Sequence, residues 1–310
     1  MNTTHPRITV VGSFAVGLTM RASRFPVKGE TLLGRDFDMG PGGKGSNQAV
    51  GAARLGAKSH FVGLIGEDLF GAMAIQLYAT EGVHTEYLRR TNARNTGVGF
   101  ITLNDAGDNH IVLDMGANEL LTPADVDHAE GVIAQSDAVL AVLEIPPAAA
   151  ARAMELARRH HVTAILNPAP ATALAPAVLA NVDVLTPNES ELRILLGLAP
   201  DDPTDTLELA GRLRQMGVRN IVVTRGAQGA FVIHADGTTE QVPGIAVKVV
   251  DTTGAGDAFT CALGVALAKG ETLSDAVRYA TYAGALACTK LGVIPALATG
   301  EEIAALMANV

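Results

Sequence analysis

Short runs of apolar and β-branched residues recur along the chain and predict buried strands. The first run is Ile8–Phe14, with the sequence ITVVGSF. Later runs occupy residues 60–65, 138–143, 163–166, 182–185 and 221–224. Segments with helical spacing lie between them, at 47–55, 72–81, 148–160 and 207–216. Strands that alternate with helices predict a mostly parallel sheet covered by helices on both faces.

Two regions interrupt this alternation. Residues 20–39 are polar and contain Pro26, Gly29 and Gly34, and residues 96–114 predict a hairpin that turns at 104–108. We expect a small β lid from segments at about 15–40 and 96–115, although an ordinary hairpin at the sheet edge would show the same pattern. After residue 255 the chain is nearly all helical, and no linker or repeat divides it. The sequence predicts one α/β domain over residues 1–310.

The composition is that of a folded globular protein and argues against several classes. Hydrophobic residues make up 48% of the 310 residues, and the formal net charge is −9. That apolar content is ample for a core, and a duplex-binding protein normally carries a basic face that this sequence lacks. The longest charge-free stretch, residues 162–182, contains three prolines and is not a membrane helix. We expect a soluble, cytoplasmic protein that binds neither nucleic acid nor membranes.

A glycine-rich segment, residues 40–47 (GPGGKGSN), leads into the first amphipathic helix. Its small residues let the backbone approach a ligand, and a helix N-terminus presents unpaired N–H donors. Lys44 adds a cation, and Asn47 adds both a donor and an acceptor. These groups suit a polyhydroxylated or anionic ligand, although a glycine turn that caps a helix is an equally simple interpretation.

The same segment matches the spacing G-x-G-x-x-G at Gly40, Gly42 and Gly45, which leaves a nicotinamide-dependent oxidoreductase as an alternative. That fingerprint should follow the first strand directly. Here about thirty residues intervene, and Arg35–Met39 is not predicted to be a strand. Nor is this a Walker A phosphate loop, because Lys44 is followed by Gly45 where that motif requires Ser or Thr.

A second glycine-rich segment, residues 251–257 (DTTGAGD), leads straight into an apolar helix. Amides at such a helix start, together with the helix dipole, stabilise negative charge. Asp257 would repel a phosphate there. Its presence is explained if it takes a proton from a hydroxyl that attacks the phosphate. The segment therefore indicates phosphoryl transfer, with a first-turn carboxylate favoured by the dipole as the alternative.

Three further features lie where strands are predicted to end. Asn188 and Glu191 are three residues apart and are expected to share one helical face, which could order a Mg²⁺ ion through water. The loop at 224–229 follows a strand, and ligands of open α/β sheets lie beyond the carboxyl ends of strands. Glu144 closes another strand and could hold a sugar hydroxyl. A capped helix start, a simple turn and a surface acid are the respective alternatives.

Taken together, these segments resemble the ribokinase-type, PfkB-like family of carbohydrate kinases. The most specific matches are GGKGSNQA at 42–49 and DTTGAGDAF at 251–259, and NPAP at 167–170 and TPNESE at 186–191 agree with them. The resemblance covers almost the whole chain. It implies a three-layer α/β/α sandwich with a β lid that often mediates dimers. It also implies an ATP-dependent kinase that phosphorylates a primary hydroxyl of a pentose or related sugar.

The resemblance also implies roles for individual residues. Asp257 would be the general base, with an anion hole at Gly254, Ala255 and Gly256. The implied sugar site consists of Ala15, Gly17, Gly43, Lys44, Gly45, Ser46, Asn47, Glu144 and Asp257. The implied ATP site consists of Asn188, Thr224, Arg225, Gly226, Ala227, Gln228, Gly229, Gly256, Asp257 and Thr281. Glu191 would lie near Mg²⁺, through water. A monovalent cation, usually K⁺, would be bound mostly by carbonyls of Asp251, Thr253, Ala287, Lys290 and Gly292.

The chain departs from the family pattern in two places. Ribokinases carry an Asn and an Asp shortly after their first Gly-Ser, and both hold ribose hydroxyls; here the matching positions are Ala15 and Gly17. A kinase of the same fold for a deoxy, branched or keto sugar, or for a sugar acid, is therefore the near alternative to a ribose kinase. Ala296 stands where the family usually has Ser, so one cation ligand is missing. A non-catalytic sugar-binding protein is the remaining alternative, and the intact Asp257 argues against it.

Overall fold

The computed structural model describes residues 5–106 and 108–309, and its centre is a nine-stranded sheet. Across the sheet its strands are β13 (Thr239–Val242), β12 (Ala230–Ile233), β11 (Asn220–Thr224), β10 (Val184–Leu185), β9 (Thr163–Asn167), β8 (Ala138–Val142), β1 (Arg7–Val11), β4 (Lys58–Gly66) and β5 (His84–Thr91). From β11 to β5 all neighbours pair in parallel, and β12 and β13 add antiparallel pairs at one edge. β11 and β12 must pair antiparallel, because the link between them is short and a parallel crossover needs a dozen or more residues.

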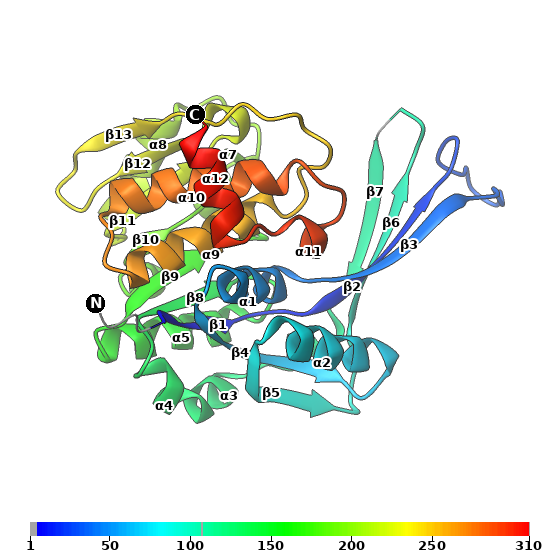
Figure 1. Cartoon of the computed structure of the whole chain (residues 1–310), viewed down its shortest axis with the longest axis horizontal. Helices are drawn as coiled ribbons and strands as arrows, with labels where there is room; N and C mark the ends of the chain where they lie inside the picture. The colour runs from blue at the N-terminus through cyan, green and yellow to red at the C-terminus, as the bar shows by residue number, and fades with distance from the viewer. Residues whose placement is uncertain (1–4, 107, 310) are drawn as a thin grey trace.

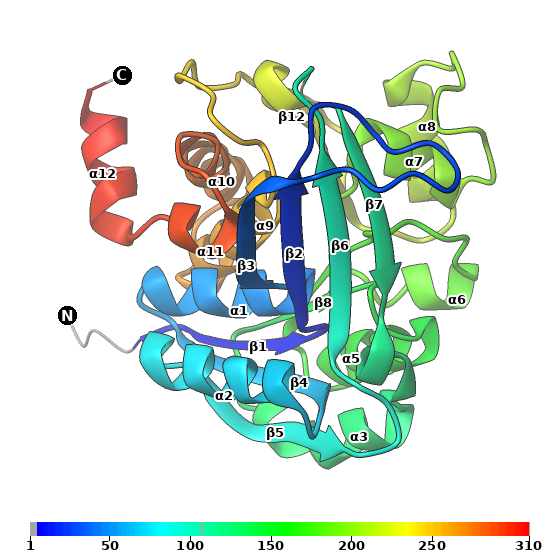
Figure 2. The same ribbon diagram turned by 90° about the vertical axis from the view of Figure 1, so that its right-hand side faces the viewer.

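Helices cover both faces of this sheet, and together with it they form three layers (Figure 2). One face carries α1 (Lys44–Arg54), α2 (Leu69–Glu81), α9 (Ala255–Ala268), α10 (Leu273–Ala287), α11 (Val293–Ala296) and α12 (Gly300–Ala308). The other carries α3 (Pro123–His128), α4 (Glu130–Ile133), α5 (Pro147–Arg159), α6 (Pro176–Leu179), α7 (Glu189–Leu195) and α8 (Thr206–Gln215). In β1, Ile8 and Val10 pack toward α1 and α9, whereas Val11 packs toward α5, as the two-residue period of a strand requires. The predicted α/β/α sandwich is confirmed.

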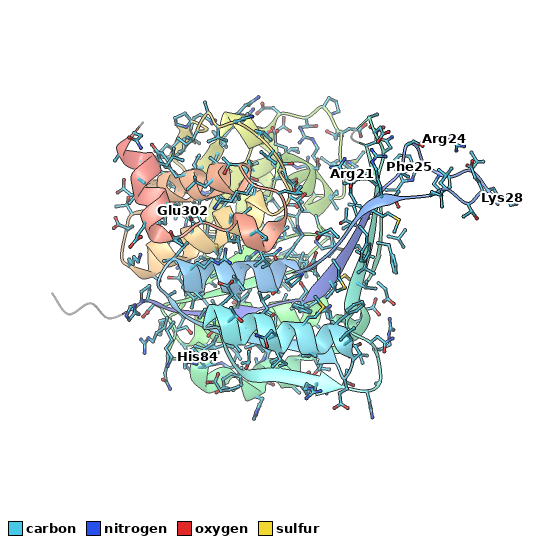
Figure 3. All side chains as sticks on the ribbon, turned by 45° about the vertical axis from the view of Figure 1, so that its right-hand side comes forward. Arg21, Arg24, Phe25, Lys28, His84 and Glu302 are labelled. Carbon is cyan, nitrogen blue, oxygen red and sulfur yellow. The ribbon has the colours of Figure 1, made fainter. Side chains whose placement is uncertain are left out.

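A second sheet of four strands projects from this body (Figure 1). Its order is β3 (Arg35–Gly42), β2 (Ala15–Arg21), β6 (Gly97–Leu103) and β7 (Asn109–Asp114), and we call it the lid sheet. Arg21, Arg24, Phe25 and Lys28 lie at its far end (Figure 3). The predicted hairpin is present as β6 and β7, which pair antiparallel; Gly107 of its turn lies outside the described residues.

Two local expectations were wrong. Arg35–Met39 belongs to β3, because this segment pairs antiparallel with β2. Its side chains are exposed, so it lacks the apolar run by which a buried strand is recognised, and Pro41 is tolerated because β3 is an edge strand. The strand predicted over Ile8–Phe14 ends at Val11, and the next three residues lead from the main sheet to the lid sheet.

The start of α1 packs directly against this link. A Cβ atom on Gly45 would lie 2.5 Å from Ser13 N and 2.6 Å from Gly12 Cα. One on Gly12 would lie 2.6 Å from Gly45 Cα. Such distances are too short for any side chain, so two backbones can approach here only because both residues are glycine. The amide of Ser46 donates to Ser13 O at 2.8 Å and fixes the contact.

Among residues 5–106 and 108–309, no helix combines the length and the apolar character needed to cross a bilayer.

We predict that Gly45→Ala destabilises the protein by about 1–3 kcal/mol, because the added methyl group overpacks this contact. Gly211→Ala is the matched control: Gly211 also lies in a helix, α8, and a Cβ there meets nothing within 4 Å. The control should stabilise by about 0.5–1 kcal/mol, since alanine favours a helix interior. Urea unfolding of the two variants measures both changes, and equal effects would contradict the packing argument.

Candidate active site

Asp257 lies in the first turn of α9, where only 4% of its surface is exposed. Both oxygens of its carboxylate accept hydrogen bonds from side chains of α1. Asn47 Nδ2 donates to Oδ2 at 2.8 Å, and Gln48 Nε2 donates to Oδ1 at 3.2 Å. A carboxylate has about four acceptor positions, so each oxygen can still accept a further proton donor. The N-termini of the two helices thus meet around one oriented carboxylate.

The loop before α9 leaves amides available beside Asp257. Gly254 is the N-cap residue and adopts the left-handed conformation, with φ of 80°. A Cβ on it would meet Val293 Cγ1 at 2.4 Å, so glycine is required there. No side chain caps the helix, and the amides of a first helical turn have no intrahelical partner. The amide of Ala255 donates to Thr252 O at 3.3 Å, a long bond, and Ala255 and Gly256 stand at a helix start of the kind that suits an anion.

A second network links the start of α1 to the ends of β1 and β8. The Oε2 atom of Glu144 accepts from Ser13 Oγ at 2.6 Å and from the amide of Lys44 at 2.8 Å, which leaves Oε1 for another donor. Burial raises the pKa of Glu144, and the Lys44 charge opposes that rise. The Asp257 carboxylate, followed by Glu144, raises the pKa of Lys44 despite its burial. The charges of Asp257 and Glu144 thus favour the protonated form of Lys44.

Asn47 is 4% exposed, and its Oδ1 has no hydrogen-bond partner within residues 5–106 and 108–309. Its Nδ2 is already committed to Asp257. A buried acceptor beside a carboxylate suits a hydroxyl-rich ligand, because each hydroxyl supplies a proton donor. Among the residues expected at the sugar, Gly43, Lys44, Gly45, Ser46, Asn47, Glu144 and Asp257 come together here. Gly43 needs its φ of 88°, and a Cβ there would meet Ala15 N at 2.8 Å.

Ala15 and Gly17 lie at the start of β2, where the lid sheet leaves the body. They pair with Gly42 and Gly40 of β3. A Cβ on Gly17 would have Ile101 Cδ1 as its nearest atom, at 3.5 Å, so the position has room for a side chain. This part of the lid sheet thus offers small and apolar groups at the two departures from the family pattern.

The sequence analysis missed three residues of these networks. Gln48 and Asn167 are part of the motifs GGKGSNQA and NPAP but were assigned no role, and Ser13 was treated only as the end of a strand. Gln48 Nε2 also donates to Asn167 Oδ1 at 3.1 Å, and Asn167 Nδ2 donates to Thr186 O at 3.0 Å. The chain of bonds connects Asp257 to the ends of β9 and β10. For Gln48 and Asn167 the signal was their place inside the two motifs, and Ser13 lies in neither of them.

The residues expected at ATP form a neighbouring group. Asn188 and Thr224 form a parallel bridge, and the amide of Thr224 donates to Pro187 O at 2.9 Å. The loop after Thr224 contains the short helix η2 (Gly226–Gln228) and ends at Gly229, where φ is 87°. Residues 188 and 224–229 therefore lie side by side, beyond the ends of β10 and β11.

Thr281 lies apart from this loop in the sequence and is buried in α10. Its hydroxyl donates to Val277 O at 2.9 Å, within its own helix. The oxygen can still accept a bond, but its proton is used inside the helix.

The expectation that Asn188 and Glu191 share a helical face was wrong. Asn188 is the N-cap of α7, and its side chain accepts from the amide of Glu191 at 2.8 Å. Glu191 Oε2 accepts from the amide of Asn188 at 2.9 Å, so the two residues close a capping box. Burial raises the pKa of Glu191, and Lys44 opposes that rise. The other oxygen, Oε1, can still bind a water of a Mg²⁺ ion.

The residues expected around a monovalent cation also come together in part. Asp251 accepts from the amide of Thr253 at 2.9 Å through Oδ1, and from the amide of Gly292 at 3.2 Å through Oδ2. Ala287 is the last residue of α10, and the next residue, Cys288, accepts hydrogen bonds through its carbonyl oxygen from the amides of Val250 at 2.8 Å and Asp251 at 3.3 Å. Lys290 directs its ammonium group to Glu302, at 2.9 Å. Backbone carbonyls of the loop and of the end of α10 are oxygen donors of the kind that K⁺ takes.

Comparison with known proteins agrees with this geometry. The model of the pfkB family of carbohydrate kinases matches residues 5–299. A ribokinase of Haemophilus influenzae is 36% identical over 295 residues, covering 95% of this chain and 96% of its own length. A deoxyribokinase of Salmonella typhi is 37% identical over 254 residues, covering 81% and 82%. The structure of Arabidopsis thaliana ribokinase with ribose and ATP superposes with a TM-score of 0.91 at 30% identity, over 98% of this chain and 99% of that one.

The match spans nearly the whole chain, and its two glycine-rich segments meet at Asp257. The chain belongs to the pfkB family of carbohydrate kinases and is an ATP-dependent sugar kinase of the ribokinase type.

Proposed function

We propose that Asp257 is the general base that removes the proton from the sugar hydroxyl as it attacks the γ-phosphate of ATP. The observation that carries this proposal is the pair of amide donors, Asn47 and Gln48, which orient the buried carboxylate at the start of α9. Phosphoryl transfer depends mainly on positioning and on stabilisation of charge. A carboxylate that keeps free acceptor positions in a buried site is able to take the proton.

The charge that develops on the transferred phosphoryl group would be stabilised by the amides at Gly254, Ala255 and Gly256. Asn188, Thr281 and residues 224–229 would position ATP beyond the ends of β10 and β11. Glu191 would order a hydrated Mg²⁺ ion, which supplies charge neutralisation for the phosphates when it is bound. Lys44 would add its positive charge between the sugar and the phosphate.

We propose further that the preferred sugar is not ribose. Ala15 and Gly17 carry no hydrogen-bonding side chain, although the start of β2 borders the sugar-binding residues of α1. A charge-assisted hydrogen bond contributes about 1.5–3 kcal/mol, so its absence removes a reason to select a sugar with hydroxyls at those positions. A deoxy, branched or keto sugar, phosphorylated at a primary hydroxyl, fits these residues better.

Three further features of the family belong to this proposal. Asp251 and the carbonyls of Thr253, Ala287, Lys290 and Gly292 would bind an activating K⁺ ion. The exposed edges of the lid sheet would pair two copies of the chain, because an edge strand offers unpaired backbone groups. We also propose a cytoplasmic location for the enzyme, since its reaction consumes ATP.

We predict that Asp257→Asn lowers kcat by at least about 10²-fold and leaves ATP binding largely intact, because asparagine cannot accept the proton. Asp275→Asn is the matched control, since Asp275 is also a first-turn acid, in α10. If Asp257 acted only through the helix dipole, both variants would behave alike. An ADP-release assay and a titration with ATP measure the two effects, and unchanged turnover of Asp257→Asn would overturn its role.

Gln48→Met should lower kcat by at least about tenfold, with KM for ATP little changed, because one of the two donors that orient Asp257 is lost. Gln76→Met is the control: Gln76 is exposed on α2, and its side-chain amide donates to Thr80 Oγ1 at 3.3 Å. A merely structural role for Gln48 would lower the melting temperature but preserve kcat of the folded enzyme. That result would show that Asp257 needs no second donor.

A panel of ribose, deoxyribose, branched pentoses, ketoses and sugar acids tests the substrate proposal. We expect a sugar other than ribose to give the highest kcat/KM. The double variant Ala15→Asn/Gly17→Asp should raise kcat/KM for ribose by at least about tenfold. Thr19→Asp, which adds a charge further along β2, should not. If the unaltered protein prefers ribose, the proposal about the sugar fails while the kinase assignment stands.

A further inference from the structure

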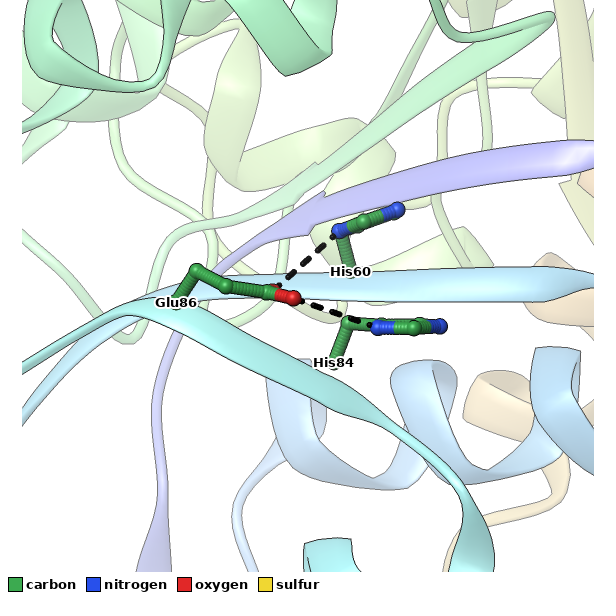
Figure 4. Close-up of side chains that lie close together, drawn as sticks. All are labelled: His60, His84 and Glu86. Carbon is green, nitrogen blue, oxygen red and sulfur yellow. Dashed lines mark hydrogen bonds and ion pairs between the residues drawn. The ribbon is translucent and has the colours of Figure 1, made fainter.

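Two histidines and a glutamate meet at the edge of the main sheet, away from the active site (Figure 4). His60 is near the start of β4, and His84 and Glu86 are near the start of the edge strand β5. The active-site residues follow the carboxyl ends of the parallel strands, so this cluster lies at the opposite ends of β4 and β5. Nothing in the proposed kinase mechanism uses it.

The register of the two strands creates the cluster. His60 pairs with His84, but Val62 pairs with Tyr87, so β5 carries one extra residue over this stretch. Such a bulge re-aims the neighbouring side chains. Glu86 thereby turns toward both imidazole rings, which stack with centroids 4.6 Å apart.

The spacing of the three groups is that of a metal site. His60 Nδ1 is 3.6 Å from Glu86 Oε2, and His84 Nδ1 is 3.3 Å from Glu86 Oε1. The three donor atoms all lie within 4.8 Å of one another. Two ligands bound at 2.0–2.1 Å to a tetrahedral zinc ion are about 3.4 Å apart, so only small side-chain rotations would complete the site.

A second observation points to a ligand. His60 is 9% exposed, and its Nδ1 has no hydrogen-bond partner within the part of the chain that the structure describes. A buried polar atom without a partner is costly. Imidazole nitrogen is the commonest metal ligand of proteins, so this unpartnered nitrogen is able to bind an ion.

We propose that His60, His84 and Glu86 bind one divalent transition-metal ion, with zinc as the best match. Imidazole nitrogen suits zinc, whereas Mg²⁺ prefers oxygen ligands, so this site would be distinct from the magnesium of the kinase reaction. The exposed side chains of His84 (40%) and Glu86 (59%) leave the outer side open for water. A bound ion would tie the edge strand β5 to β4.

The surrounding charges set the strength of the site. Arg7 lies in the same hollow but pairs with Asp137, at 3.3 Å. Lys58 precedes His60 by two residues on β4, so it lies on the same face of the strand and repels a cation. Removing this charge should strengthen metal binding if the ion is bound here.

Calorimetric titration with ZnCl₂, after treatment with a chelator, tests the proposal. We expect one zinc ion per chain, a loss of affinity of at least about tenfold in His84→Ala and in Glu86→Gln, and no change in His110→Ala. His110 is an exposed histidine of the lid sheet, on β7. Because His84 and Glu86 are partly exposed, these variants should fold, as an unchanged melting temperature without zinc would show.

Two further measurements make the result specific. Lys58→Gln should tighten zinc binding several-fold, which a site elsewhere on the chain would not show. Co²⁺ in place of zinc should give the visible absorption of a low-coordinate site with nitrogen ligands in the unaltered protein and not in His84→Ala. If the protein binds no zinc, or if His84→Ala and Glu86→Gln bind it as the unaltered protein does, the proposal is wrong. Sugar-kinase activity measured with Mg²⁺ should be the same in all these variants.

Discussion

The active site depends on one contact, the hydrogen bonds from Asn47 and Gln48 of α1 to the carboxylate of Asp257 in α9. They join residues about 210 positions apart in the chain and bring two helix N-termini to one point. A buried carboxylate is costly unless it is hydrogen-bonded, so these donors stabilise the group as well as orient it. The same bonds extend through Asn167 to the ends of β9 and β10. The charges of Asp257 and Glu144 favour the protonated form of Lys44.

This contact is possible only because the start of α1 can approach the link between β1 and β2. Gly12 and Gly45 meet with no room for a side chain, and Gly43 needs a positive φ. The glycines therefore serve packing first, and the ligand site results from where they place the helix. The parallel sheet brings Ser13 and Glu144 to the same side, since the carboxyl ends of its strands share one edge. The lid sheet leaves the body at this point, and so the start of β2 lies beside the start of α1.

The start of β2 and the histidine cluster on β4 and β5 lie at opposite ends of the parallel strands. Beside α1, Ala15 and Gly17 place small groups at the start of β2, whereas the side chains that bond to Asp257 are Asn47 and Gln48. At the opposite ends of β4 and β5, a register shift gathers His60, His84 and Glu86 on the sheet edge. By our proposals the first feature acts on substrate choice and the second on a separate ligand, and the two lie at opposite ends of the parallel strands.

The sequence by itself determined the layered α/β fold, the hairpin of the lid and the position of the two glycine-rich helix starts. These features depend on local periodicity and on backbone conformations that glycine adopts more readily than any other residue. It did not reveal β3, because an exposed edge strand lacks an apolar pattern, and it left open whether Asn188 and Glu191 share a helical face or cap a helix start, as they do in the structure. Tertiary structure alone decided that Gln48, Asn167 and Ser13 join the hydrogen-bond networks of Asp257 and Glu144, and that a bulge brings Glu86 to two histidines. Hydrogen bonds between residues distant in the chain, and strand register, leave no periodic trace in a single sequence.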